Sequence, residues 1–403
     1  MRLRSFASII LILIFVSAFR LNAENTDTIP RISLITCHAG KDVYELCGHT
    51  AIRIQYNGSD DVVNYGLFDF DSPNFVYRFV KGETDYHVGA YPFAYFMREY
   101  CRDNRRVVEQ QLNITPQQAW KIIELLSINL RPENRVYRYN YVKNNCATLP
   151  IGIIEKAIGD SIAFSAPTIP SSEEWSFRDE MKHFHRNYPW YQFGIDLALG
   201  VGLDYRLPLR EKMFAPEALE QMMRGATITE CIGNEVPIVA ETLILNNGDP
   251  NGAQLEPTPW YLTPMAACSL LFVIILAFTI RDIRRKKVSR WVDCVIFTLF
   301  GVMGCLLTFL IFISVHEATS PNYLYVWLNP LCFIAAIAIW LKKCKVVLLC
   351  YHFINFVALL ALIVAWHWLG QEANVAFIPL IACSIMRSFN YYYINKCAVK
   401  KIA

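Results

Sequence analysis

Five apolar runs dominate the last third of the chain. They lie at 263–280, 292–314, 323–341, 346–366 and 374–391. Each is close to the roughly 20 residues that a helix needs to cross about 30 Å of hydrocarbon. The pattern therefore predicts an α-helical membrane domain of five transmembrane helices over residues 263–403.

The connectors between these runs differ in charge from one to the next. Those after residues 280 and 341 are basic (RDIRRKKVSR and LKKCK), and so is the C-terminal tail. Those after residues 315 and 366 (HEATSPN and HWLGQEAN) contain no Lys or Arg. Because basic connectors stay in the cytoplasm, we expect a cytoplasmic C-terminus and an exported segment before residue 263.

The N-terminus also indicates export. Residues 1–23 begin with Arg2 and Arg4, continue with the apolar stretch ASIILILIFVSAF and end at the small residue Ala23. This is the pattern of a cleavable signal peptide, and an uncleaved first membrane helix is the alternative. In both cases residues 24–245 form an exported domain, and 246–262, rich in Asn, Gly and Pro, form a linker.

In contrast to the long apolar runs of the membrane domain, the exported domain has short apolar segments separated by polar residues. Segments 31–37, 49–56 and 61–68 have strand-like composition, 76–87 offers further strands, and 137–141 alternates. Residues 113–129 predict a helix, with Thr115 and Gln118 as a capping box around Pro116. A second helix is expected to start between Asn144 and Pro150. These elements predict an α+β domain, a small antiparallel sheet with packed helices.

Cys146 is the first candidate for chemistry, because it lies at the start of the second helix. The positive end of the helix dipole and the free N–H groups there favour a thiolate, which is the nucleophilic form. Its neighbour Asn145 is expected to cap the helix or to contribute to an oxyanion site. A buried, unreactive cysteine is the competing interpretation.

His49 is the candidate base for this thiol. It opens the strand HTAIRIQY after Gly48, where an imidazole has no evident packing role. A Cys–His pair needs a third polar group to orient the ring. Asn64, on the neighbouring strand, and Glu45, four residues upstream, are the two choices that the spacing leaves open.

Charge and cysteine content give only limited information about ligands and cofactors. The net charge of +3 comes largely from the cytoplasmic connectors, so it gives no argument for nucleic acid. Of thirteen cysteines, five lie in the exported domain, an odd number that leaves one unpaired or all reduced. Zinc-ligand spacings are absent around Cys37-His38 and Cys47-x-His49, so we expect no metal and no cofactor. His183 and His185 are expected at the surface, and His352 and Asn355 in helix packing within the membrane.

Four segments of this sequence resemble a known family. They are YELCGHTAIRI, FMREYCRDNRRVVEQQLNITPQQ, RPENRVYRYNYVKNNCAT and GIDLALGVGLDYRLPLREKMFAPEAL. In order, they resemble the Bacteroides-type lipoprotein N-acyltransferases, over most of residues 31–225. The His-before-Cys order is also distantly similar to the permuted papain-like fold of the NlpC/P60 and lecithin:retinol acyltransferase group.

The resemblance implies roles for particular residues. Cys146 matches the nucleophile position and His49 the base, while Glu45 and Asp204 fall in motif positions without an assigned role. Cys47 departs from the family pattern, which has an aromatic there, and it becomes a rival nucleophile.

The function implied is acyl transfer in the inner (cytoplasmic) membrane. A phospholipid would donate an acyl chain, through a cysteine thioester, to the N-terminal amine of a diacylated lipoprotein. The alternative is a membrane-tethered cysteine hydrolase, a peptidase or amidase that acts on peptidoglycan or protein. A non-catalytic scaffold is a third interpretation, which a disulfide at Cys146 would favour.

Overall fold

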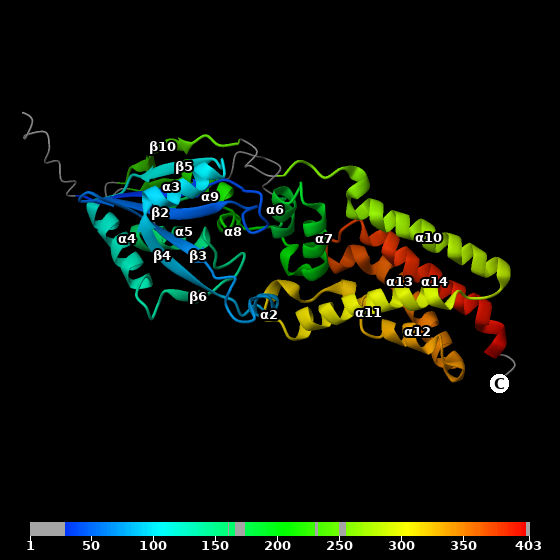
Figure 1. Cartoon of the computed structure of the whole chain (residues 1–403). Coiled ribbons are helices and arrows are strands. Elements are labelled where there is room, and N and C mark those ends of the chain that lie inside the picture. The colour runs from blue at the N-terminus through cyan, green and yellow to red at the C-terminus, as the bar shows by residue number, and fades with distance from the viewer. Residues whose placement is uncertain (1–28, 160, 166–173, 230–232, 250–254, 400–403) are drawn as a thin grey trace, which may run out of the picture.

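The computed structural model describes residues 29–159, 161–165, 174–229, 233–249 and 255–399. The signal peptide predicted at 1–23 and part of the predicted linker lie outside these residues. Figure 1 shows a sheet-rich domain joined to a bundle of long helices, with α6 and α7 between the two.

One antiparallel sheet of seven strands forms the centre of the first domain. The strand order is β10-β5-β1-β2-β3-β4-β6. The strands are β1 (Arg31–Cys37), β2 (His49–Tyr56), β3 (Ser59–Leu67), β4 (Asp85–Pro92), β5 (Val107–Leu112), β6 (Val136–Arg138) and β10 (Val239–Asn246). The first two match the predicted bounds. The expected extra strands in 76–87 are only partly present, because β4 is preceded by a helix.

Helices cover both faces of this sheet, so its strands are apolar on both sides. On one face, Leu34, Ile52 and Val63 pack with residues of α4, α5 and α9; on the other, Ile35 and Val62 pack against α3. The bounds are α2 (Phe75–Lys81), α3 (Phe93–Arg102), α4 (Pro116–Asn129), α5 (Thr148–Ile158) and α9 (Pro216–Arg224). The α+β prediction is confirmed in this sense.

The predicted helix over 113–129 is present as α4. Thr115 and Gln118 form the expected capping box, and Pro116 is the first helical residue. Its buried face carries Ala119, Ile122 and Leu126, and Trp120 is 44% exposed.

A smaller lobe lies between the sheet and the bundle. It contains short helices, with Phe177, Phe184 and Phe214 in its core. The helices are α6 (Phe177–Phe184), α7 (Pro189–Ala198) and η2 (Val201–Leu203), and α8 (Leu209–Lys212) leads on to α9.

A three-stranded sheet packs instead with the core of the main sheet, through Ile162, Ile228 and Val236. Its strands are β7 (Ile162–Ala163), β8 (Thr227–Thr229) and β9 (Glu235–Pro237).

The C-terminal domain is helical, but the prediction of five spanning helices is not confirmed. Among the described residues, three helices are long and apolar enough to cross a membrane. They are α10 (Pro264–Arg285), α11 (Arg290–Phe312) and α13 (Lys345–Leu369). The run 323–341 instead forms a short 3-10 turn, η5 (Tyr323–Val326), and one short helix, α12 (Cys332–Ala338). Asn329-Pro330 separates the two, since proline lacks the N–H that a helix interior needs.

The fifth run forms α14 (Phe377–Val399), a long helix with buried polar residues. Its Arg387 forms ion pairs with Asp282 of α10 and Asp293 of α11. These polar side chains lower the hydropathy of α14 while they tie it to its neighbours. The predicted packing of His352 and Asn355 is observed, because both bond to Ser388 of α14 at 3.2 and 2.8 Å.

Candidate functional site

Cys146 lies where a turn leads into α5. Asn145 fixes this turn: its side-chain oxygen accepts from the N–H groups of Ala147 and Thr148, both at 2.9 Å. Its amide nitrogen donates to the carbonyls of Tyr141 and Phe214, both at 2.8 Å. This is the arrangement of a helix cap. Because both amide hydrogens are committed, Asn145 has none left for an oxyanion, and we withdraw that alternative.

The Cys146 thiol is free and partly exposed. Its sulfur faces two backbone N–H groups, those of Cys146 itself and of Thr50 at the start of β2. A bulge in β3 between Asn64 and Leu67 brings Gly66 against it. Gly66 has φ +87°, and a Cβ there would lie 3.5 Å from Cys146 Cβ. The thiol therefore lies between the first turn of α5 and the strands β2 and β3.

His49 is the first residue of β2. The next residue, Thr50, has the backbone N–H that faces the Cys146 sulfur. The turn that leads to it requires glycine, since Gly48 has φ +80° and a Cβ there would lie 2.5 Å from the Cys37 carbonyl oxygen. Within the described residues there is no direct hydrogen bond between the sulfur and the imidazole. Catalytic hydrogen bonds are often long in the absence of substrate.

Asn64 is the residue that contacts the His49 ring. Its Oδ1 is hydrogen bonded to His49 Nε2, and its Nδ2 donates to the Tyr91 hydroxyl at 2.5 Å. An amide oxygen only accepts, so His49 Nε2 must carry the proton. The lone pair is then on Nδ1, the ring nitrogen that can receive a proton from the thiol.

Glu45, the other choice for the third group, does not contact His49. It forms an ion pair with Arg105 at 2.8 Å, and Arg105 also donates to the His38 carbonyl at 3.0 Å. Sequence reasoning missed Arg105, a buried residue whose positive charge acts on both the thiol and the imidazole. Nothing in the run DNRRV distinguishes it from its neighbours.

Electrostatics keep the resting pair neutral. Burial lowers the pKa of His49 to about 4, the hydrogen bond that His49 donates to Asn64 opposes this shift, and the charge of Arg105 adds to it. Burial raises the pKa of the Cys146 thiol to about 11, although the two backbone N–H groups and Arg105 oppose this. At neutral pH the imidazole is therefore an unprotonated base and the sulfur retains its proton.

Cys47 is a poorer nucleophile in this structure. Its sulfur is hydrogen bonded to the Tyr141 hydroxyl at 2.8 Å. Burial raises the pKa of its thiol to about 12, the largest of several causes. Cys146 has the lower pKa of the two and the backbone donors.

The described residues contain no group of His, Cys, Asp and Glu that could hold a metal ion. His38 instead contacts Glu217 and Glu220 at 3.3 and 3.0 Å. The expectation that His185 lies at the surface is wrong: it is buried and hydrogen bonded to Gln192 at 2.8 Å.

Arg178 of α6 pairs with the two carboxylates that dock its lobe onto the helical bundle. It is fully buried between Asp196, at 3.0 Å, and Asp204, at 2.5 Å. The same carboxylates reach the bundle, because Asp196 accepts from Asn374 at 2.9 Å and Asp204 from the N–H of Glu372 at 3.2 Å. The structure thus gives Asp204 a docking role that its sequence motif did not reveal.

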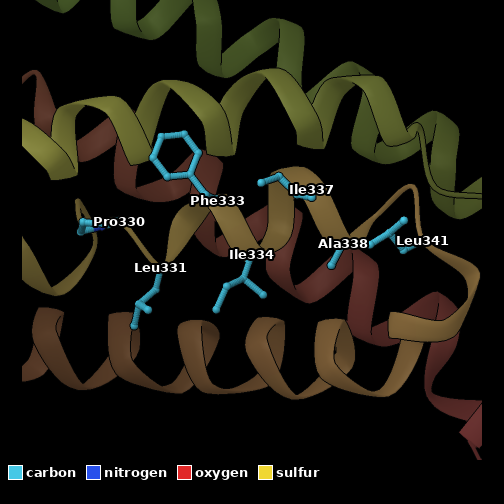
Figure 2. Close-up of a pocket in the computed structure, with 7 residues that line it drawn as sticks. All are labelled: Pro330, Leu331, Phe333, Ile334, Ile337, Ala338 and Leu341. Atoms are coloured by element: carbon cyan, nitrogen blue, oxygen red, sulfur yellow. The ribbon is translucent and has the colours of Figure 1, made fainter.

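The apolar pocket of Figure 2 lies elsewhere, in the bundle. It has a volume of about 340 Å³ and lies along α12. Its lining consists of Pro330, Leu331, Phe333, Ile334, Ile337, Ala338 and Leu341. With no titratable side chain, it offers room for apolar chains and no catalytic group.

Fold and site together define a class: a membrane protein whose periplasmic α+β domain carries a free thiol at the start of α5 and, at the start of β2, a neutral imidazole next in the chain to Thr50, whose N–H faces the sulfur. Two family models match the chain, the Lnb N-terminal periplasmic domain over residues 21–171 and the Lnb transmembrane domain over residues 256–398. The chain belongs to the Lnb family, the lipoprotein N-acyltransferase family that its motifs resemble. Neither a curated protein nor a solved structure matches it, so the likeness to papain-like folds stays a prediction.

Proposed function

We propose that this protein transfers an acyl chain from a phospholipid, through a thioester on Cys146, to the N-terminal amine of a diacylated lipoprotein. The observation that carries the proposal is the free Cys146 thiol, which faces the N–H of Thr50, the residue after His49 with its partner Asn64, in a domain that is docked onto membrane helices. The family supports enzyme activity in general, and the site supports this chemistry in particular.

The first half-reaction forms the acyl-enzyme. His49 Nδ1 takes the thiol proton as the sulfur attacks the ester carbonyl of the phospholipid. The carbon–oxygen bond then breaks, and the imidazolium gives its proton to the departing lysophospholipid oxygen. Because the resting thiol and imidazole are both neutral, proton transfer accompanies the attack instead of preceding it. The backbone N–H groups of Cys146 and Thr50, which face the sulfur, are available as donors to the developing oxyanion.

The second half-reaction releases the chain. The lipoprotein amine attacks the thioester, an amide bond forms, and the carbon–sulfur bond breaks. His49 takes a proton from the amine and returns one to the sulfur. If water took the place of the amine, the same site would act as the hydrolase that the sequence left open.

The membrane domain suits substrates that remain in the bilayer. A methylene group costs about 0.8 kcal/mol to transfer into water, so a chain of about sixteen carbons costs roughly 12 kcal/mol. The docking contacts around Arg178 hold the catalytic domain against the bundle. The basic connectors support an inner-membrane protein with a periplasmic catalytic domain and a cytoplasmic C-terminus.

The test is the acyl state of lipoproteins in a strain that lacks its own lipoprotein N-acyltransferase. Expression of the protein should yield triacylated N-termini by mass spectrometry, and Cys146→Ala should not. Cys101→Ala is the matched control, since this free cysteine is exposed on α3 and should leave acylation intact. Diacylated lipoproteins with the unaltered protein, together with cleaved peptidoglycan or protein, would favour the hydrolase.

A further inference from the structure

An exposed apolar surface lies on α2 and the loop before it. Phe70 is 59% exposed, Val76 73%, Tyr77 53% and Phe79 49%. No residue of α2 is buried. Exposed apolar patches that are contiguous commonly mark interaction sites.

This helix docks on the end of α11 that faces the sheet domain (Figure 1). The Val315 N–H donates to the Lys81 carbonyl at 2.8 Å, and His316 Nε2 donates to the Phe79 carbonyl at 2.9 Å. Val80 packs against the core of the bundle.

The apolar surface of α2 continues into that of the bundle. Tyr77 meets Phe309 of α11 with ring centroids 5.9 Å apart. On the same end of α11, Phe312 and Val315 are 67% and 59% exposed. The α2 patch is thus an extension of the surface that faces lipid.

A series of aromatic rings leads from α2 toward the thiol. Successive ring centroids are 4.1 to 6.0 Å apart. We call this set the aromatic row: Tyr139, Tyr86, Phe68, Phe75 and Phe79. The row reaches Cys146 through Phe68, which follows Gly66 by two residues, and a Cβ on Gly66 would lie 3.5 Å from Cys146 Cβ. The electrostatics agree, because after burial the Cys146 thiol is the next cause that raises the pKa of Tyr86 and Tyr139.

We propose that α2 and the loop before it insert into the outer leaflet, and that the aromatic row binds the acyl chain of a bilayer phospholipid on its way to Cys146. The second part rests on the proposed function, and the first does not. The continuity of α2 with the lipid-facing end of α11 identifies the occupant as lipid. The row is mostly hydrocarbon, which suits an acyl chain better than a peptide, whose backbone needs hydrogen-bond partners.

The first part is tested by photocrosslinking in phospholipid nanodiscs. The full chain carries Cys146→Ala, so that no acyl transfer occurs, with p-benzoylphenylalanine in place of Val76. Trp120 is the matched control position, because α4 is exposed at the far end of the sheet domain (Figure 1). We expect at least tenfold more phospholipid adduct at position 76 than at 120. Equal labelling, or adducts with protein only, would overturn the insertion.

The second part is tested with two acyl donors of different length. For Phe75→Ala and Phe79→Ala we expect the KM for vesicle phospholipid to rise at least fivefold, and acylation by water-soluble p-nitrophenyl acetate to be unchanged. A loss with both donors, or with neither, would overturn chain binding by the row. Because adduct formation does not require catalysis, a lipid adduct without any transferase activity would refute the proposed function and leave the insertion standing.

Discussion

Asn64→Leu tests whether the hydrogen bond that His49 donates to Asn64 contributes to catalysis. Leucine is close in size to asparagine but cannot accept from His49 Nε2 or donate to Tyr91. Asn64 is 4% exposed, so the lost partner cannot be replaced freely by water. A buried polar group left without a partner costs about 1–3 kcal/mol. If this cost falls on the transition state, acylation slows roughly 5- to 150-fold.

The assay is single-turnover acylation of the purified full-length protein by a fluorescent phospholipid in vesicles. Tyr91→Phe is the matched control, because it removes the hydroxyl on the other side of Asn64 and leaves the bond to His49 in place. Asn64→Asp keeps the acceptor and adds a negative charge, so it should raise the pKa of His49 and move the acid limb of the pH profile upward. A packing defect would lower the rate without moving the acid limb of the pH profile, so this shift shows that Asn64 acts on the His49 ring.

The reasoning fails if Asn64→Leu acylates at the unaltered rate. It also fails if the loss tracks folded protein alone, or if Asn64→Asp leaves the pH profile unchanged.

Three other predictions follow from the same geometry. Arg178→Met should lower the free energy of unfolding in detergent by about 3–5 kcal/mol, since it leaves two buried carboxylates unpaired; a change below about 1 kcal/mol would contradict the docking role. The pKa of His49, about 4 in the folded protein against about 6.5 unfolded, should place the acid limb of kcat/KM well below pH 6. Between about pH 6.5 and about pH 4, only the unfolded chain binds a proton at His49, so the free energy of unfolding decreases as the pH is lowered. In acid denaturation, His49→Gln should therefore show a smaller dependence of stability on pH. Cys47→Ala should keep most of the acylation rate, and a complete loss would return Cys47 to consideration as nucleophile.

Local patterns predicted much of the sheet domain. The segments 31–37 and 49–56 form strands with those bounds, because their β-branched residues suit a sheet covered on both faces. The capping box at Thr115 marks a helix start through backbone groups within three residues. Within 76–87, where strands are expected, residues 76–81 belong to the helix α2 instead. A short apolar stretch does not distinguish a strand from an exposed helix that packs on another domain.

The membrane runs show where composition is insufficient. The run 323–341 is apolar apart from Asn329, yet Pro330 interrupts it and the Asn329 backbone lies against Gly304 of α11, where a Cβ would be 2.4 Å away. From sequence alone, Arg387 is an unfavourable residue for a spanning helix. The structure accounts for it, because Arg387 forms ion pairs with carboxylates on two other helices.

Some residues of the candidate site could be identified from sequence motifs, and others only from the structure. Sequence motifs singled out Cys146 and His49 as candidates, and the structure brings Asn64, not Glu45, to the imidazole. Arg105 and Arg178 could not be predicted, because their importance depends on burial beside partners distant in the chain.

Direct detection of the acyl-enzyme tests the central claim. The purified protein is incubated with phospholipid vesicles in the absence of lipoprotein, digested and examined by mass spectrometry. We predict one acyl chain on the peptide that contains Cys146, removed by neutral hydroxylamine as a thioester is, and absent from Cys146→Ala. An acyl chain on another residue, or lysophospholipid release by Cys146→Ala at the unaltered rate, would contradict the account.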